Sequence, residues 1–286
     1  MDLKKLKEKK DIKKLLEFSI INIDKPSGPT SFWTSQFVKK QLGLTKTSHF
    51  GTLDPAVSGV LPIALNRACR LSDYFMHRNK TYVGIMRIHK DNVTDKILDK
   101  EIKKFIGKIK QLPPVRSRVK REVREREVKY FRILERDGKE VLFETEVQAG
   151  TYIRRICDDI GKEIGGAHML ELRRIKAGIF SETDEKYPSI NLYDFEKAVN
   201  EYKKGNEEKL RSMLIPAEIV SDIILPIQIN KDNLKKILTG KPLMKVDIGE
   251  KIENERFSAF VGDKFIGIYR KVEEGDIVAR AEFVFN

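Results

Sequence analysis

The sequence contains few cysteines and histidines and no long apolar run, and these shortages exclude several classes of protein. It has 286 residues with 2 cysteines, Cys69 and Cys157, which are too few for a disulfide framework. The 4 histidines show no metal-ligand spacing with cysteine or with one another, so we predict no metal site. No segment approaches the ~20 apolar residues of a membrane span, and the lysine-rich start lacks the apolar stretch of a secretory signal. We therefore expect a cytoplasmic protein.

Positive charge, in contrast, is in excess. The chain has 56 Lys and Arg residues against 43 Asp and Glu residues, which gives a formal net charge of +13 at pH 7. Such an excess favours a polyanionic partner, either nucleic acid or an anionic membrane surface. Because the sequence shows no membrane span and no secretory signal, nucleic acid is the better interpretation.

The order of the predicted elements indicates the fold class α+β. Strand and helix patterns interleave without the regular alternation of a parallel doubly wound sheet. Helical patterns cover a basic N-terminal segment at 1–17 and residues 31–43, 100–110 and 153–164. Alternating patterns predict strands at 19–23, 82–88, 128–134 and 141–147, the last two joined as a hairpin across Asp137 and Gly138.

Two of these helices carry specific expectations about single residues. In the second, Ser31 is expected to be the N-cap and Gly43 to end the helix. Its inward-facing side chains are expected to be Trp33, Phe37, Val38 and Leu42. In the last helix Cys157 falls at an apolar position, which predicts a small buried thiol and not a metal ligand.

The C-terminal part of the chain has a different sequence pattern. From about residue 224, short strand-like pieces such as 257–261 and 265–270 are separated by glycine-containing turns, and 233–238 has the pattern of a short helix. We therefore predict two domains, one over residues 1–221 and a small β-rich one over residues 222–286.

The block at residues 49–62 is the most informative part of the sequence. It places Asp54 in a turn-forming setting before Pro55, with Gly51 and Gly59 on either side. An isolated Asp-Pro turn more often only ends an element of secondary structure. A carboxylate held on a loop between regular elements is, however, also a common way to present a nucleophile or a general base.

Four ordered blocks of sequence resemble the TruB/dyskerin family of RNA pseudouridine synthases. They are DKPSGPTS at 24–31, HFGTLDPAVSGVLP at 49–62, KTYV at 80–83, and GTYIR at 150–154 with LRR at 172–174. The resemblance implies a catalytic domain built on a mixed, largely antiparallel sheet. The C-terminal part resembles a PUA domain, a small β-barrel that binds RNA.

The resemblance also assigns catalytic roles to three residues. It implies that Asp54 is the nucleophile, that Tyr82 stacks on the extruded uracil and takes part in proton removal, and that Arg154 pairs with Asp54 and favours its charged form. Singly, a strand tyrosine more often only packs in a core, and an arginine at a helix start is more often only solvated. Their joint occurrence in the expected order favours the catalytic interpretation.

Further residues are expected to contact the substrate by the same resemblance. These are His49, which would help to displace the extruded base, with Gly51, Thr52, Leu172 and Lys25. Taken alone, Lys25 is as consistent with a structural role as with an RNA contact. The family usually has glycines beside the histidine where this chain has Ser48 and Phe50, so Phe50 is expected to add bulk where the backbone approaches RNA.

A basic strip and the C-terminal part supply the predicted RNA contacts. Between residues 115 and 129 the candidates are Arg116, Arg118 and Lys120. The alternative for this strip is a solvated strand edge, in which the strip's own glutamates Glu122, Glu125 and Glu127 neutralise the charge. In the C-terminal part, Lys241 follows a glycine in a turn that would let backbone approach phosphate.

The resemblance implies an isomerase that needs no cofactor and has RNA as its partner. Two substrates stay open: uridine 55 in the T-arm of tRNA, and guide-directed rRNA sites in an H/ACA ribonucleoprotein, whose small subunits would then be further partners. The alternative from another class is a non-catalytic RNA-binding or assembly protein that kept the fold. Retention of Asp54, Tyr82 and Arg154 together favours the enzyme.

Overall fold

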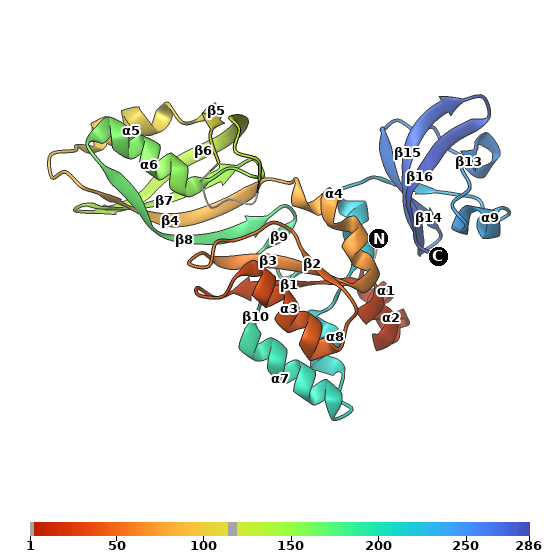
Figure 1. Cartoon of the computed structure of the whole chain (residues 1–286). Coiled ribbons are helices and arrows are strands. Elements are labelled where there is room, and N and C mark those ends of the chain that lie inside the picture. Colours follow the sequence, from red (N-terminus) through yellow and green to blue (C-terminus); the bar gives the residue numbers. More distant parts are fainter. Residues whose placement is uncertain (1–2, 114–118) are drawn as a thin grey trace.

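Two sheets organise the part of the chain that the computed structural model describes, which is residues 3–113 and 119–286 (Figure 1). Within these residues the larger sheet contains β1 (Ser19–Lys25), β2 (Thr47–His49), β3 (Ser58–Leu65), β4 (Lys80–Ile88), β5 (Gly107–Gln111), β6 (Arg124–Asp137), β7 (Glu140–Val147), β8 (Ala167–Ala177), β9 (Phe180–Ser181), β10 (Ile190–Asn191) and β11 (Ile215–Pro216). The smaller sheet contains β12 (Pro226–Gln228), β13 (Leu243–Met244), β14 (Arg256–Val261), β15 (Lys264–Glu274) and β16 (Ile277–Val284). The predicted class, α+β, is confirmed.

The larger sheet is mixed and consists of two halves. Its main order is β10-β1-β3-β8-β4-β7-β6-β5, and most neighbouring long strands are antiparallel. The halves meet where β3 runs parallel to β8 over two residue pairs, Ser58 with Arg173 and Gly59 with Arg174. A Cβ atom on Gly59 would lie 2.2 Å from the backbone oxygen of Arg174, so this close approach requires glycine.

Helices cover both halves of the larger sheet. The α-helices are α1 (Leu3–Lys9), α2 (Ile12–Glu17), α3 (Ser31–Leu42), α4 (Ser72–Met76), α5 (Asp95–Lys103), α6 (Ile153–Ile164), α7 (Leu192–Lys203), α8 (Glu208–Met213) and, in the smaller sheet, α9 (Leu234–Leu238). Short 3-10 turns are η1 (Asn66–Leu71), η2 (Ala217–Asp222) and η3 (Lys245–Asp247). Helix α6 packs on β8 and β4 with α5 beside it, whereas α3 and α7 pack on the half that contains β1 and β3 (Figure 1).

Helix α6 and the hairpin of β6 and β7 follow the sequence prediction closely. The residues of α6 that face the protein core, including Cys157, are buried. Gly165 ends the helix in the left-handed conformation. Asp137 and Glu140 pair across the predicted turn. Strand β6 starts at Arg124, earlier than predicted, because its first residues pair with β5.

The extents of two predicted helices were wrong in detail. Residues 1–17 form two helices, because the carboxylate of Asp11 accepts a hydrogen bond from Lys14 N at 2.8 Å and starts a second helix. The helix predicted at 100–110 is α5, which ends at Lys103, and Gly107, with φ +91°, leads into β5. These boundaries depend on caps and on pairing with distant strands.

Helix α3 begins differently from the prediction. Its N-cap is Thr30, whose Oγ1 accepts a hydrogen bond from Trp33 N at 3.0 Å, and Ser31 is the first helical residue. Trp33, predicted to face inward, has 49% of its surface exposed and stacks on Phe37. Val38 is fully buried and Gly43 ends the helix, as predicted.

The smaller sheet is curled into a half-barrel that lies beside α4 and the N-terminal helices (Figure 1). Its aromatic residues join those of the larger sheet in one buried cluster. Phe18 lies between the two: its ring centroid is 5.5 Å from that of Phe265 and 4.2 Å from that of Phe285. The two sheets therefore share part of their core.

None of the helices in the described ranges has the length and apolar character needed to cross a membrane.

Candidate active site

Asp54 lies on a short loop that leads into β3, at the junction of the two halves of the larger sheet. The loop is held from inside by Leu53 and Val57, each 3% exposed, whereas the side chain of Asp54 is 56% exposed. Val57 N donates to the backbone oxygen of Asp54 at 3.0 Å and closes the turn. Two buried apolar anchors thus direct one carboxylate outward from a fixed turn.

The first sequence block, residues 24–31, braces this loop. The hydroxyl of Ser31 accepts a hydrogen bond from Leu53 N at 2.8 Å and donates to Leu53 O at 3.0 Å. Gly28 N donates to Pro55 O at 2.9 Å, and the hydroxyl of Ser27 donates to Ala56 O at 3.1 Å. These contacts explain why the two blocks occur together.

Lys25 belongs to the same brace. Its Nζ donates to Pro26 O at 2.7 Å, to Pro29 O at 2.8 Å and to Pro55 O at 3.1 Å, and the residue is fully buried. An ammonium group has three N–H donors, so all of them are used within the protein. This geometry corresponds to the structural role that the sequence left open for Lys25.

Arg154 reaches Asp54 from the first turn of α6. Its Nη2 lies 2.8 Å from Asp54 Oδ2, and the Arg154 side chain is 51% exposed. The start of α6 is fixed by Gln111, whose side chain accepts from Tyr152 N at 3.0 Å and donates to Tyr152 O at 3.2 Å. Exposed ion pairs contribute little to stability. At 2.8 Å the guanidinium nevertheless holds the Asp54 carboxylate toward the start of α6.

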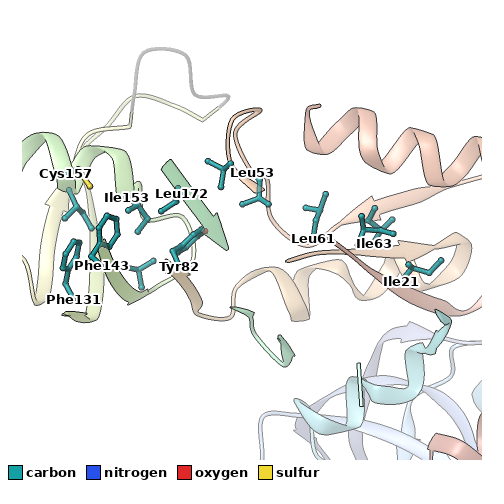
Figure 2. Close-up of a cluster of buried hydrophobic side chains, with 14 of the residues drawn as sticks. Ile21, Leu53, Leu61, Ile63, Tyr82, Phe131, Phe143, Ile153, Cys157 and Leu172 are labelled. Carbon is teal, nitrogen blue, oxygen red and sulfur yellow. The ribbon is translucent and has the colours of Figure 1, made fainter. Parts of the chain in front are cut away.

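Tyr82 and Leu172 pack in the same buried cluster as the residues that precede Asp54 and Arg154 in sequence. Both residues are 9% exposed and belong to one buried cluster with Leu53 and Ile153. Figure 2 shows Tyr82 and Leu172 close to Ile153, between α6 and the loop that carries Leu53. The structure thus brings the predicted residues Asp54, Arg154, Tyr82 and Leu172 together from four elements of the fold.

Burial and a neighbouring charge lower the pKa values of three basic residues, Lys80, His49 and Lys25. Burial, and then the charge of Arg174, lower the pKa of Lys80 from 10.5 to about 7. The same two causes, in the same order, lower the pKa of His49 and of Lys25, and for Lys25 the charge of Asp54 acts in the opposite direction. His49 Nδ1 is buried without a hydrogen-bond partner in the described part of the chain. Burial and the charge of Arg174 thus favour the neutral form of the His49 imidazole.

The residues around His49 correct one expectation. Phe50 does not face RNA: it is 1% exposed and stacks on Phe75 with ring centroids 4.8 Å apart. Phe50 directly follows β2, where its N–H donates to Pro62 O at 2.9 Å, and its side chain enters the core. Thr52 is exposed, whereas Gly51, with φ +105°, faces inward: a Cβ atom on it would lie 3.5 Å from the side chains of both Arg174 and Lys80.

Sequence reasoning missed Arg174, Lys80, Gln111 and the bracing role of Ser31. The period-2 alternation of strands could have identified two of them. Arg174 lies two residues after Leu172 on β8, and Lys80 lies two residues before Tyr82 on β4, so each shares a face with a residue that was predicted. Gln111 and Ser31 act through contacts with distant backbone, for which the sequence has no signal.

Of the predicted RNA contacts, the structure describes Lys120 and Lys241. Arg116 and Arg118 are outside the described residues. Lys120 Nζ is 3.0 Å from a carboxylate oxygen of Glu122, and both side chains are largely exposed. Glu125 pairs with Lys108 and Glu127 with Lys129. Glu122 and Glu127 thus pair within the strip, as the alternative expects, whereas Glu125 pairs with a lysine of β5 outside it. Lys241 is exposed on the connection between α9 and β13.

Comparison with known proteins identifies the family. Residues 39–153 match the TruB family pseudouridylate synthase (N terminal domain), and residues 154–221 match the tRNA pseudouridylate synthase B C-terminal domain. A probable tRNA pseudouridine synthase B from Methanopyrus kandleri is 43% identical over 238 residues, which are 82% of this chain and 69% of that protein. The chain belongs to the TruB family.

A second TruB relative supports the same assignment. The probable tRNA pseudouridine synthase B from Nanoarchaeum equitans is 38% identical over 270 residues, which are 94% of this chain and 71% of that protein. The TruB chain is therefore a pseudouridine synthase, which is an isomerase. These names do not support the alternative of a non-catalytic assembly protein.

Solved structures extend the TruB similarity over both sheets. A structure of a Cbf5-Nop10-Gar1 complex matches with a TM-score of 0.86 and 36% identity, over 98% of this chain and 88% of that chain. A structure of an H/ACA RNP bound to a substrate RNA containing 2'-deoxyuridine matches with a TM-score of 0.85 and 34% identity, over 98% of this chain and 89% of that chain. The mixed sheet and the half-barrel together are thus an architecture shared with these proteins.

Proposed function

We propose that this pseudouridine synthase isomerises uridine in RNA with Asp54 as the nucleophile. The observation that carries the proposal is the placement of Asp54 on a braced loop, beside Arg154 and the buried cluster that contains Tyr82 and Leu172. A carboxylate can form a labile covalent adduct with the substrate. The two loop anchors and the Arg154 guanidinium keep this carboxylate in one orientation, which favours attack on a bound nucleotide.

The reaction needs only groups that such a site can supply. The N1–C1′ bond of the nucleotide breaks, a C5–C1′ bond forms, C5 loses its proton and N1 gains one, so atoms and electrons balance without an oxidant or a reductant. Tyr82 would stack on the extruded uracil and take part in removing the C5 proton. His49 would help to replace the base in the RNA stack.

Substitution of the carboxylate tests the nucleophile. Asp54→Asn keeps the size of the side chain and removes its nucleophilic charge, so we expect pseudouridine formation to stop while RNA binding persists. Asp95→Asn is a matched control, because Asp95 is also an exposed carboxylate paired with an arginine, Arg136, at a distant edge of the sheet. Pseudouridine formed by stoichiometric Asp54→Asn protein would refute the assignment.

Two substrates remain in the proposal, uridine 55 of tRNA and guide-directed rRNA sites. The relatives' names support the first, and the structures of H/ACA assemblies, with their small protein subunits, support the second. The pure protein should be incubated with unmodified tRNA transcript, with and without guide RNA and small subunits, and pseudouridine should be mapped. Modification of uridine 55 without guide RNA would establish the first mode, and modification only with guide RNA the second.

We further propose that residues 222–286 are a PUA-like RNA-binding domain and residues 1–221 the catalytic domain. Support comes from the curled smaller sheet and from Lys241, which follows Gly240 with φ +86° at an exposed turn. Each neutralised phosphate releases condensed counterions, so RNA affinity should fall linearly with the logarithm of salt concentration.

The salt slope tests the Lys241 contact. Lys241→Ala should weaken RNA binding and reduce the salt slope by about 1. Lys264→Ala, which removes another exposed lysine of the same sheet, is the control and should leave the slope unchanged. Equal slopes for both variants and the wild type would remove Lys241 from the interface.

A further inference from the structure

Arg174 is a buried charge that the site, as described so far, does not use. It is 1% exposed and is the largest of the fully buried side chains. No carboxylate pairs with it in the described part of the chain. Burial of an unpaired charge destabilises a protein strongly. A role outside stability would explain why the chain carries it at this position.

Its contacts connect three separate pieces of the site. Nε donates to Val60 O on β3 at 2.8 Å, and Nη2 donates to Gly51 O, on the Asp54 loop, at 3.0 Å. Burial lowers the pKa of Arg174, and the neighbouring side chain of Tyr82 acts in the opposite direction, so the two side chains are within interaction range. The backbone supports this contact, because Tyr82 and Arg174 are direct cross-strand partners on β4 and β8, next to a shift in register.

We propose that Arg174 is the positioning residue that fixes the Tyr82 hydroxyl relative to the loop carrying Asp54. The inference rests on the proposed function, in which these two side chains act on the uridine. A guanidinium is suited to this role, since it is planar, always protonated and has five N–H donors in a rigid fork. Lysine at this position would keep a charge and lose the fork.

The contacts of Arg174 differ from those of the neighbouring residue, Arg173. Arg173 points to the other face of β8, where it donates to both carboxylate oxygens of Asp24 at 3.0 and 2.9 Å and to Glu182 at 2.8 Å. Arg173 is thus a conventional ion-paired residue. Arg174 instead donates to two backbone oxygens and lies directly across from Tyr82 on the neighbouring strand.

Single-turnover kinetics with Arg174→Lys test the proposal. We expect the rate constant to fall by ~10²-fold, as for a small misplacement of reacting groups, while RNA affinity stays within twofold of wild type. The matched control is Arg136→Lys, because the guanidinium of Arg136 also donates to two backbone oxygens, Val93 O at 2.7 Å and Gly138 O at 3.0 Å. An unchanged rate for Arg174→Lys would overturn the proposal.

A double-mutant cycle separates positioning from a general structural effect. If Arg174 acts through the hydroxyl of Tyr82, Arg174→Lys should cost about tenfold less in a Tyr82→Phe background than in the wild type. Multiplicative effects of the two substitutions would contradict the inference. If Asp54→Asn abolishes turnover and the cycle shows no coupling, the proposed function stands and only the role of Arg174 fails.

A spectroscopic measurement decides the case if Arg174→Lys does not fold. The Nε–H of Arg174 is buried and hydrogen-bonded, so its resonance should be observable in protein labelled with ¹⁵N-arginine. Tyr82→Phe removes a single oxygen atom and should shift this resonance. Tyr130→Phe, the control, removes a hydroxyl that donates to Glu144 and should not. An Arg174 resonance unmoved by Tyr82→Phe would refute the contact.

Discussion

Lys80 shows how the fold sets the charge of a single side chain. It lies two residues before Tyr82, is 4% exposed, and donates through Nζ to the backbone oxygens of Met76 and Arg78. Burial, with the charge of Arg174 as the second cause, gives it a pKa of about 7 in the folded protein against 10.5 normally. Between these values the unfolded state binds more protons than the folded state. Stability therefore increases with pH in this window and is lost as the pH falls toward 7.

Substitution of Lys80 should remove this dependence. We expect the free energy of unfolding of wild type, minus that of Lys80→Met, to increase from pH 7 to pH 9 by up to about 1.4 kcal/mol per pH unit. Urea unfolding of both proteins at several pH values measures the difference. Lys241→Met, which replaces an exposed lysine, should give a difference that is constant with pH. A pH-independent difference for Lys80→Met would contradict the assigned environment.

The site residues that belong to a recognised sequence motif could be predicted. Residues whose position depends only on packing in the folded protein could not. Asp54 and Arg154, predicted to pair, are 2.8 Å apart. Phe50 was misplaced, because its position depends on stacking against Phe75, which only the tertiary fold brings next to it. Arg174 was missed because nothing in the sequence distinguishes an ion-paired arginine, such as Arg173, from one that binds backbone oxygens.

The start of α3 acts as a support for the Asp54 loop. Ser31→Ala would leave Leu53 N and Leu53 O without the hydroxyl that bonds both, at a cost of about 1–3 kcal/mol. We also expect faster hydrogen exchange over residues 52–57 and a lower single-turnover rate, since the carboxylate would lose its fixed orientation. Ser72→Ala is the control, because Ser72 is also buried but bonds only to Cys69 O nearby in sequence. Equal exchange and equal rates in the two variants would argue against the support.

Helices and strands with a strong hydrophobic period could be predicted from the sequence. Their boundaries were predicted wrongly where they depend on pairing with distant parts of the chain. Helix α6 combines a sustained apolar stripe with a glycine end, and its limits were close to those predicted. Strand β5 was read as helix because its residues alternate weakly and gain strand structure by pairing with β6. The break between α1 and α2 follows from one cap at Asp11, a residue that also suits a helix surface.

The shared aromatic cluster connects the stability of the two sheets. Phe265, 1% exposed, packs against Phe18 of the larger unit, whereas Phe257, fully buried, packs in a cluster confined to the smaller sheet. Either substitution to alanine should lower stability by about 3–5 kcal/mol. Phe265→Ala should increase hydrogen exchange in residues 18–20 as well as in the smaller sheet. Phe257→Ala should increase it only in the smaller sheet.

The two variants Phe265→Ala and Phe257→Ala serve as controls for each other. Both remove the same group from a buried site, so a difference in where exchange increases reports the location of the cluster and not the size of the lost side chain. Identical exchange patterns would mean that the sheets unfold as one unit. The sequence could not indicate this sharing, because Phe18 and Phe265 are brought together only by the tertiary fold.

The narrow contact between β3 and β8 also determines the order in which the molecule can assemble. Ser58 and Arg173 are 115 residues apart in sequence, so closing this contact carries a large loss of chain entropy and little local structure to offset it. Each half of the sheet has its own hairpins and helices and can form them first. Asp54 comes from one half and Arg154 from the other. The Asp54–Arg154 pair can therefore form only when the two halves have come together.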